Sequence, residues 1–166
     1  IMNRAYITPK RIVTKYAGCK NNLIKDEHYL LERGNGQSEM NRKRCCIMTS
    51  TETEKASLLL DFGSELHGGL KLVMGSSSRR EPSLVRIRFG ESVGEANSST
   101  SNSEWKVGFS TDDHAKRDII MEIPRDGMIE IGNTGFRFVR LDLLQNNATI
   151  SLKEISAILR YRDIPY

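Results

Sequence analysis

The sequence predicts an all-β fold, an antiparallel β-sandwich of the jelly-roll type. From about residue 44 onward apolar and polar residues alternate, which is the pattern of strands that bury one face. Clusters of glycine, asparagine and serine interrupt this pattern at short intervals, as the turns of a sandwich do. Amphipathic helix spacing fits only Glu52–Leu58 and Asp26–Leu31, so βαβ units and a parallel sheet are not expected.

About nine strands are expected, most of them with residues of one parity apolar. In chain order the candidates are Arg11–Tyr16, Cys45–Thr49, Ser57–Phe62, Leu70–Met74, Ser83–Glu91, Ile119–Ile123, Met128–Ile131, Phe136–Leu144 and Ile155–Tyr161. The turn signals that separate them lie at Gly63-Ser64, Gly68-Gly69, Gly75, Pro124 to Gly127, Gly132 to Gly135 and Asn146-Asn147.

The segment Phe136–Leu144 departs from simple alternation. Phe136 and Phe138 have one parity, whereas Val139 and Leu141 have the other. Either this strand is buried on both faces or a bulge changes its phase.

A chain of 166 residues fits one domain, 1–166. We expect its core at about residues 44–162 and a partly ordered basic leader at residues 1–43. Residues 1–50 carry ten Lys and Arg against four Asp and Glu, whereas the rest carries fifteen against seventeen. Such a basic segment is more often solvated surface than a nucleic-acid site, so no nucleic-acid partner is predicted.

The three cysteines require no disulfide framework, and no C-x-x-C pair indicates a zinc site. No apolar run approaches the roughly 20 residues of a membrane-spanning helix, so no membrane contact is expected. The start of the chain lacks the layout of a signal peptide, and we expect a fragment of a larger multidomain protein.

A long polar segment from Gly94 to Arg117 carries the single tryptophan. Loops of that length in compact domains are often functional. A tryptophan ring packs on the apolar face of a sugar while nearby acids and histidines bond the hydroxyls, so a carbohydrate-binding edge is predicted here. Its candidate residues are Trp105, Asp112, Asp113 and His114, with Glu91 and Arg137 as neighbours. The alternative role of Trp105 is to anchor its loop on the sandwich.

No catalytic residue, metal site or cofactor is predicted. Calcium, held by Asp112, Asp113 and backbone carbonyls of the same loop, is the one cofactor that the residue types allow. The pairs Glu91 with Glu95 and Asp112 with Asp113 would suit glycoside hydrolysis only at set separations, and solvated acids are the simpler interpretation.

A G-x-S-x-G pattern around Ser92 follows a strand, as a nucleophile elbow does. An elbow also starts a helix, and Glu95–Ser99 is predicted to be a loop. A Ser92 hydrolase is therefore not expected.

Several segments share their order and spacing with one kind of domain. They are Ile7–Val13, Leu60–Gly69, Val85–Glu91, Asp113–Ala115, Ile131–Arg140 and Tyr161–Tyr166. Together they resemble the β-sandwich domain that precedes the catalytic barrel in bacterial α-L-rhamnosidase-like glycoside hydrolases. The resemblance implies a galactose-binding-domain-like fold and a periplasmic or extracellular location.

In those enzymes the catalytic carboxylates lie in an (α/α)₆ barrel, for which this chain has neither the length nor the pattern. The resemblance therefore implies a non-catalytic accessory domain that packs against the helical catalytic domain of its parent chain and contributes a wall of the substrate pocket or an accessory oligosaccharide contact. The main alternative is a free-standing carbohydrate- or calcium-dependent binding module. An enzyme acting alone and a nucleic-acid-binding protein are the remaining alternatives.

Overall fold

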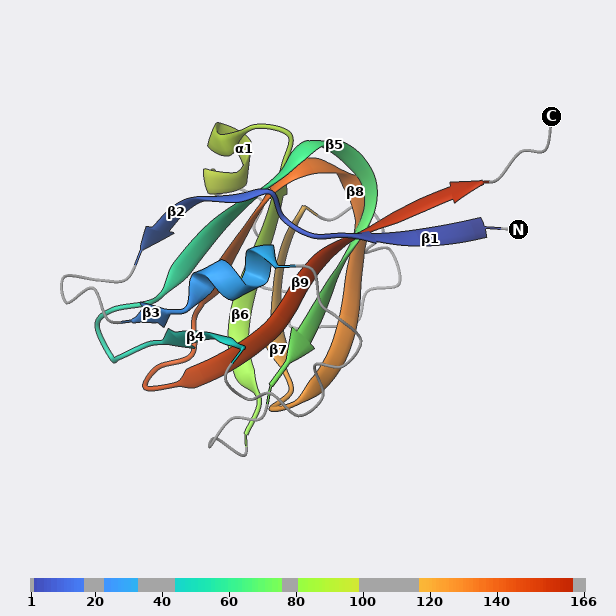
Figure 1. Cartoon of the computed structure of the whole chain (residues 1–166). Helices are drawn as coiled ribbons and strands as arrows, with labels where there is room; N and C mark the ends of the chain where they lie inside the picture. The colour runs from blue at the N-terminus through green and yellow to red at the C-terminus, as the bar shows by residue number, and fades with distance from the viewer. Residues whose placement is uncertain (1, 17–22, 33–43, 76–80, 99–116, 163–166) are drawn as a thin grey trace.

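The computed structural model describes residues 2–16, 23–32, 44–75, 81–98 and 117–162, and most of them lie in antiparallel β-structure (Figure 1). The strands are β1 (Met2–Ile7), β2 (Arg11–Tyr16), β3 (Ile24–Lys25), β4 (Cys46–Thr49), β5 (Ser57–Met74), β6 (Ser83–Gly90), β7 (Asp118–Ile123), β8 (Gly127–Leu143) and β9 (Thr149–Arg162). A 3₁₀ helix, η1 (Glu27–Leu31), and a short α-helix, α1 (Val93–Asn97), complete the described elements.

Two long bent strands turn one hydrogen-bonded sheet into two layers. The first part of β5 pairs with the last part of β8, and the last part of β5 pairs with the first part of β8 and with β9. β2, β6 and β7 extend the first of these layers, while β1 and β4 pair with β9 in the second and β3 pairs with β4. Figure 1 shows β5 and β8 arching together over one end of the molecule. The predicted antiparallel β-sandwich is confirmed.

The bends in β5 and β8 lie at glycines that were predicted to be turns between separate strands, and that prediction is wrong. Gly63 and Gly132 have φ values of +90° and +81°, a backbone conformation that is strained in residues with a side chain. Gly68 allows β5 to approach β9, because a Cβ there would lie 1.8 Å from the carbonyl oxygen of Ile158. These glycines bend continuous strands and so place parts of one strand in both layers.

The core lies between the two layers. Phe62, Phe89 and Phe136 form its largest aromatic group, with ring centroids 5.7 Å apart for Phe62 and Phe136 and 5.0 Å apart for Phe89 and Phe136. Both pairs are edge-to-face, the arrangement that aromatic rings prefer. Leu23, Ile24 and Leu30 join the same cluster, so residues upstream of 44 also contribute to the core.

The irregular segment within β8 is buried on both faces. Phe136 and Val139 lie in the main core, whereas Phe138 packs with Leu59 and Ala96 in a second cluster beneath α1. The register of β5 against β8 shifts close to Phe136, at the bend. The extra residues at this shift, between Asp61 and Leu66, belong to β5, so the β8 segment is a strand buried on both faces and not one interrupted by a bulge.

Neither helix prediction is fully correct. Asp26–Leu31 forms the 3₁₀ helix η1, but Glu52–Leu58 is irregular and then enters β5, where pairing with β2 and β8 outweighs local helical spacing. The predicted loop at Glu95–Ser99 instead begins within α1. Among the described helices, none has the length and hydropathy to cross a membrane.

Candidate functional site

The predicted carbohydrate-binding edge is only partly within the described residues. Trp105, Asp112, Asp113 and His114 lie outside them, so their prediction stays untested. Glu91 follows β6 and Arg137 lies in β8. Ser98 and Arg117, which flank the segment carrying the other four, lie next to α1 and β7.

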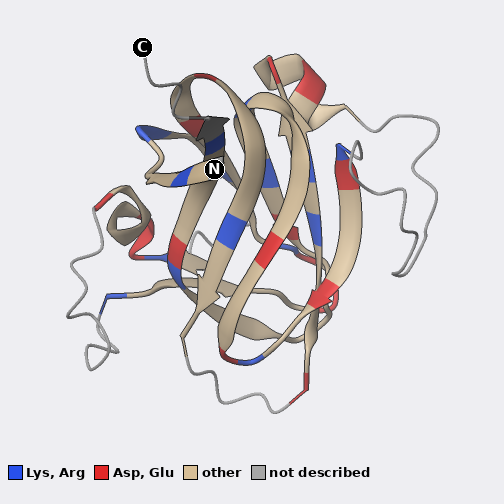
Figure 2. Cartoon of the chain, turned by 90° about the vertical axis from the view of Figure 1, so that its right-hand side faces the viewer, with Lys and Arg blue, Asp and Glu red and all other residues tan. Residues whose placement is uncertain are grey.

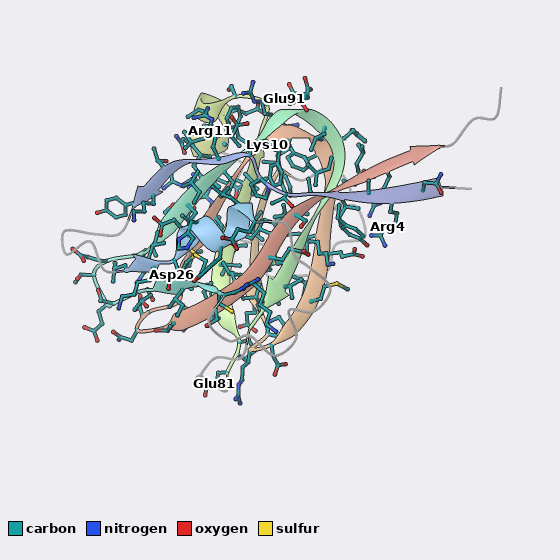
Figure 3. The ribbon with its side chains drawn as sticks, in the orientation of Figure 1. Arg4, Lys10, Arg11, Asp26, Glu81 and Glu91 are labelled. Carbon is teal, nitrogen blue, oxygen red and sulfur yellow. The ribbon has the colours of Figure 1, made fainter. Side chains whose placement is uncertain are left out.

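Glu91 and Glu65 form a carboxylate pair at the bend of β5. The exposed side chain of Glu91 shares a hydrogen bond with Glu65, and this bond together with the Glu65 charge raises the pKa of Glu91. Two carboxyl groups can form such a bond only when one carries a proton. The pair lies over Gly135, where a Cβ would be 3.3 Å from Glu91 Oε1 and 3.8 Å from Glu65 Oε1. Figure 3 shows Glu91 at the arched end of the molecule, above Lys10 and Arg11.

Arg117 places a positive charge beside this pair. Its guanidinium forms an ion pair with Glu95 of α1 and donates a 3.1 Å hydrogen bond to Thr134 Oγ1. The Arg117 charge also lowers the pKa of Glu91, in opposition to Glu65. We call Glu65, Glu91, Glu95 and Arg117 the carboxylate edge. It offers several acceptors and one guanidinium donor, a set that suits the hydroxyl groups of a sugar.

Arg137 has a structural partner rather than a place in the carboxylate edge. Its Nε and terminal nitrogen donate to the two oxygens of Asp61 at 2.9 and 3.2 Å. Among the described residues no hydrogen bond or ion pair joins Arg137 to Glu91. The guanidinium also lies 5.0 Å from the centroid of the Phe138 ring.

Asp61 links three strands. Besides Arg137 of β8, Arg11 Nε of β2 donates to it at 2.8 Å, and so does the backbone amide of Gly63. These bonds lower the pKa of Asp61 to about 2, with the bond from Arg137 as the largest cause. Asp61 is only 1% exposed, so it acts as a buried anchor for two partly exposed arginines.

Sequence reasoning missed Asp61, Glu65 and Arg117 as site residues. A signal for Asp61 was present, since it is the one charged residue directly after the apolar run Leu58–Leu60. A charge in such a run is rarely buried unless it is paired. Glu65 and Arg117 carry no comparable signal, because long-range contacts place them. The bend of β5 brings Glu65 to Glu91, and Arg117 is adjacent because β7, which it precedes, pairs with β6, which Glu91 follows.

Of the two carboxylate pairs named from the sequence, Asp112 with Asp113 lies outside the described residues. Glu91 interacts with Glu65 rather than with Glu95. Glu95, the predicted partner of Glu91, is paired with Arg117.

Ser92 does precede a helix, contrary to the prediction. Its hydroxyl caps α1 by accepting a 3.1 Å hydrogen bond from the amide of Glu95. The residue has ordinary extended backbone angles, φ −132° and ψ 163°, without the strain of a nucleophile elbow. Ser92 is therefore a helix cap.

Within the described ranges, no three His, Cys, Asp or Glu side chains are placed to hold a metal ion. The calcium option rested on Asp112 and Asp113 and stays a prediction. Figure 2 shows acidic and basic residues interspersed along the strands on one side of the molecule, without a single-sign face there.

No protein-family model matches the sequence, and no curated protein sequence is significantly similar to it. Solved structures do share the fold. A rhamnosidase from Klebsiella oxytoca with rhamnose bound aligns with 96% of this chain at a TM-score of 0.56 and 15% identity. This chain covers 29% of that rhamnosidase chain.

Two further structures resemble the chain over almost its whole length. A fucose-binding module from Streptococcus pneumoniae aligns with 93% of it, at a TM-score of 0.52 and 11% identity, with 94% of the module covered. A chain from the complex of reduced XRCC1 with the DNA polymerase β catalytic domain aligns with 97%, at a TM-score of 0.52 and 10% identity, and is covered completely. The molecule thus has the β-sandwich fold of domains found in rhamnosidases and in carbohydrate-binding modules. At these identities the likeness establishes the fold alone.

Proposed function

We propose that this chain is a non-catalytic accessory β-sandwich domain of an α-L-rhamnosidase-like glycoside hydrolase, and that it contacts carbohydrate at the carboxylate edge. The observation that carries the proposal is the match of 96% of the chain to less than a third of a rhamnosidase chain. An accessory domain of a longer enzyme would give this relation of lengths. The sequence segments that resemble the same family support it independently.

The carboxylate edge suits sugar hydroxyls more than it suits catalysis. Glu65 and Glu91 accept hydrogen bonds, and protonation of the pair adds a donor. Arg117 supplies further donors next to Glu95. Trp105, Asp112, Asp113 and His114 lie in the segment between Ser98 and Arg117, so this segment starts and ends beside the carboxylate edge.

The arrangement of the parent chain is tested by reading the coding sequence on both sides of residues 1–166. The proposal expects a helical domain of several hundred residues on one side. Coding sequence for an unrelated domain, with no helical repeat on either side, would contradict the accessory role.

The lack of catalysis is tested with the isolated chain and aryl α-L-rhamnosides. We expect no hydrolysis above the buffer rate. Turnover by this chain that disappears in Glu91→Gln but persists in the control Glu122→Gln, an exposed acid of β7, would contradict a non-catalytic role.

A second candidate function is a free-standing carbohydrate-binding module. It is favoured by the nearly complete mutual coverage with the fucose-binding module. Sugar binding by the isolated chain, together with a gene that encodes no catalytic domain, would select this candidate over the first.

A further inference from the structure

An open hollow of about 620 Å³ lies between the β1–β2 connection and the end of η1, apart from the carboxylate edge. Its lining residues are Tyr6, Ile7, Thr8, Pro9, Lys10 and Leu31. The volume falls within the roughly 300–1,000 Å³ that is typical of small-molecule sites. The side chains of these residues include an aromatic ring, aliphatic groups, a hydroxyl and an ammonium group.

The Tyr6 ring is exposed, and two neighbouring cations favour one position for it. Tyr6 is 47% exposed, and Lys71 Nζ lies 4.5 Å from its ring centroid. Arg4 Cζ is 5.8 Å from the same centroid. Contacts of this kind between a cation and an aromatic ring are attractive, so they favour one orientation of the ring.

These two cations have acidic partners of their own. Arg4 donates to both oxygens of Glu130 at 2.8 and 2.7 Å, and Lys71 lies 3.2 Å from Glu154. Their charges are therefore largely balanced without a ligand.

Lys10 differs, because no described residue accepts a hydrogen bond from its ammonium group or forms an ion pair with it. The neighbouring cations are paired, Arg11 with Asp61 and Lys15 with Glu27. The position of Lys10 is nevertheless fixed. Its amide donates to the carbonyl of Asp61 at 2.8 Å, and its Cγ lies where a Cβ on Gly63 would come within 2.7 Å.

We propose that this hollow binds an acidic sugar unit, with Lys10 bonding its anionic group and the Tyr6 ring packing against its apolar C–H face. The shared chemistry is a carboxylate or a sulfate on a pyranose ring. An anionic ligand would balance the charge of Lys10, and the ring supplies the apolar contact that sugars use. This inference rests on the proposed carbohydrate-binding role but concerns a different surface.

The test is calorimetric titration of the chain with three probes: an oligogalacturonate, a sulfated galactan oligosaccharide and a neutral galactan oligosaccharide. The variants are Lys10→Gln and Tyr6→Leu. Lys25→Gln is the matched control, since Lys25 is also an exposed lysine but does not line the hollow. Thermal unfolding of each variant confirms that it is folded.

We expect acidic probes to bind more tightly than the neutral one, and Lys10→Gln to weaken them about threefold to fivefold, as the loss of one exposed charge pair would. Tyr6→Leu should weaken binding too, whereas Lys25→Gln should have no effect. Preference between the carboxylated and the sulfated probe identifies the anionic group.

Equal affinity of wild type and Lys10→Gln for the acidic probes would overturn the inference. If neutral sugars bind and acidic sugars do not, the hollow is excluded as a site for acidic sugars, while the proposed carbohydrate-binding function stands. If no sugar of any kind binds, both fail.

Discussion

Asp61 provides the sharpest test of how this sandwich is held together. Its carboxylate accepts hydrogen bonds from Arg11, Arg137 and the amide of Gly63, and so joins β2, β5 and β8 at the bend. The variant Asp61→Asn keeps the size and one acceptor but removes the charge. The arginines then lose their buried counter-charge.

The magnitude follows from the pKa. Lowering the pKa of Asp61 from 3.8 to about 2 corresponds to roughly 2.5 kcal/mol at neutral pH, since one pKa unit equals about 1.4 kcal/mol. Both arginines are partly exposed and so are screened by solvent, which reduces the expected loss in the free energy of unfolding to about 2 kcal/mol. For a domain of this length the loss corresponds to a decrease in Tm of about 4–8 °C.

The pH dependence separates charge from packing. Because the pKa of Asp61 is lower in the folded state, its contribution is complete above about pH 4 and is lost as the pH falls toward about 2. Urea unfolding of wild type and Asp61→Asn at pH 7, 4 and 3 measures this, with Asp126→Asn, an exposed turn acid, as control. A loss in the free energy of unfolding that is the same at pH 3 and pH 7, or no greater than the loss in the control, would refute the stabilising role of the Asp61 charge.

Three other predictions concern the bend, the carboxylate edge and the core. Gly68→Ala should prevent soluble folding, because its Cβ would clash with the carbonyl of Ile158. The control Gly94→Ala in α1 meets no atom within 4 Å and should be neutral or slightly stabilising. Equal soluble yields and Tm values for the two variants would contradict this. Glu91→Gln should raise Tm at neutral pH and have little effect near pH 3. The pKa of Glu91 is raised in the folded state, so deprotonation of Glu91 opposes folding as the pH rises. A lower Tm of Glu91→Gln at pH 7 would contradict this and show that the charge of Glu91 is needed. Phe136→Ala should cost about 3–5 kcal/mol in urea unfolding, since the ring is fully buried between Phe62 and Phe89, and a loss under about 1 kcal/mol would mean that the core collapses around the gap.

The strands were predictable where one face is buried and the other is wet. β6 and β7 agree with their predicted ranges to within a residue, because alternation leaves a clear period of two. β1 was not predicted as a strand, since its apolar residues do not dominate one parity. Its pairing with β9 stabilises it instead.

The bends of β5 and β8 show why the two-layer arrangement could not be predicted from the sequence. A glycine such as Gly63 is equally compatible with a turn between strands and a bend within one, and only long-range pairing decides between them. The same pairing creates the candidate site. It brings Glu65 of β5 next to Glu91, which is distant in the chain. Helix α1 is too short to show periodicity, so Glu95–Ser99 was predicted to be a loop.

The central claim is that this sandwich contacts sugar at the carboxylate edge. The most direct measurement is an NMR titration of the ¹⁵N-labelled chain with rhamnose- and fucose-containing oligosaccharides, following the backbone amides of Glu65, Glu91, Glu95 and Arg117. The account predicts saturable shifts at these amides, reduced by Arg117→Gln and unchanged by Arg125→Gln, an exposed arginine of the β7–β8 turn. Saturable shifts confined to other surfaces, or none with any sugar, would contradict it.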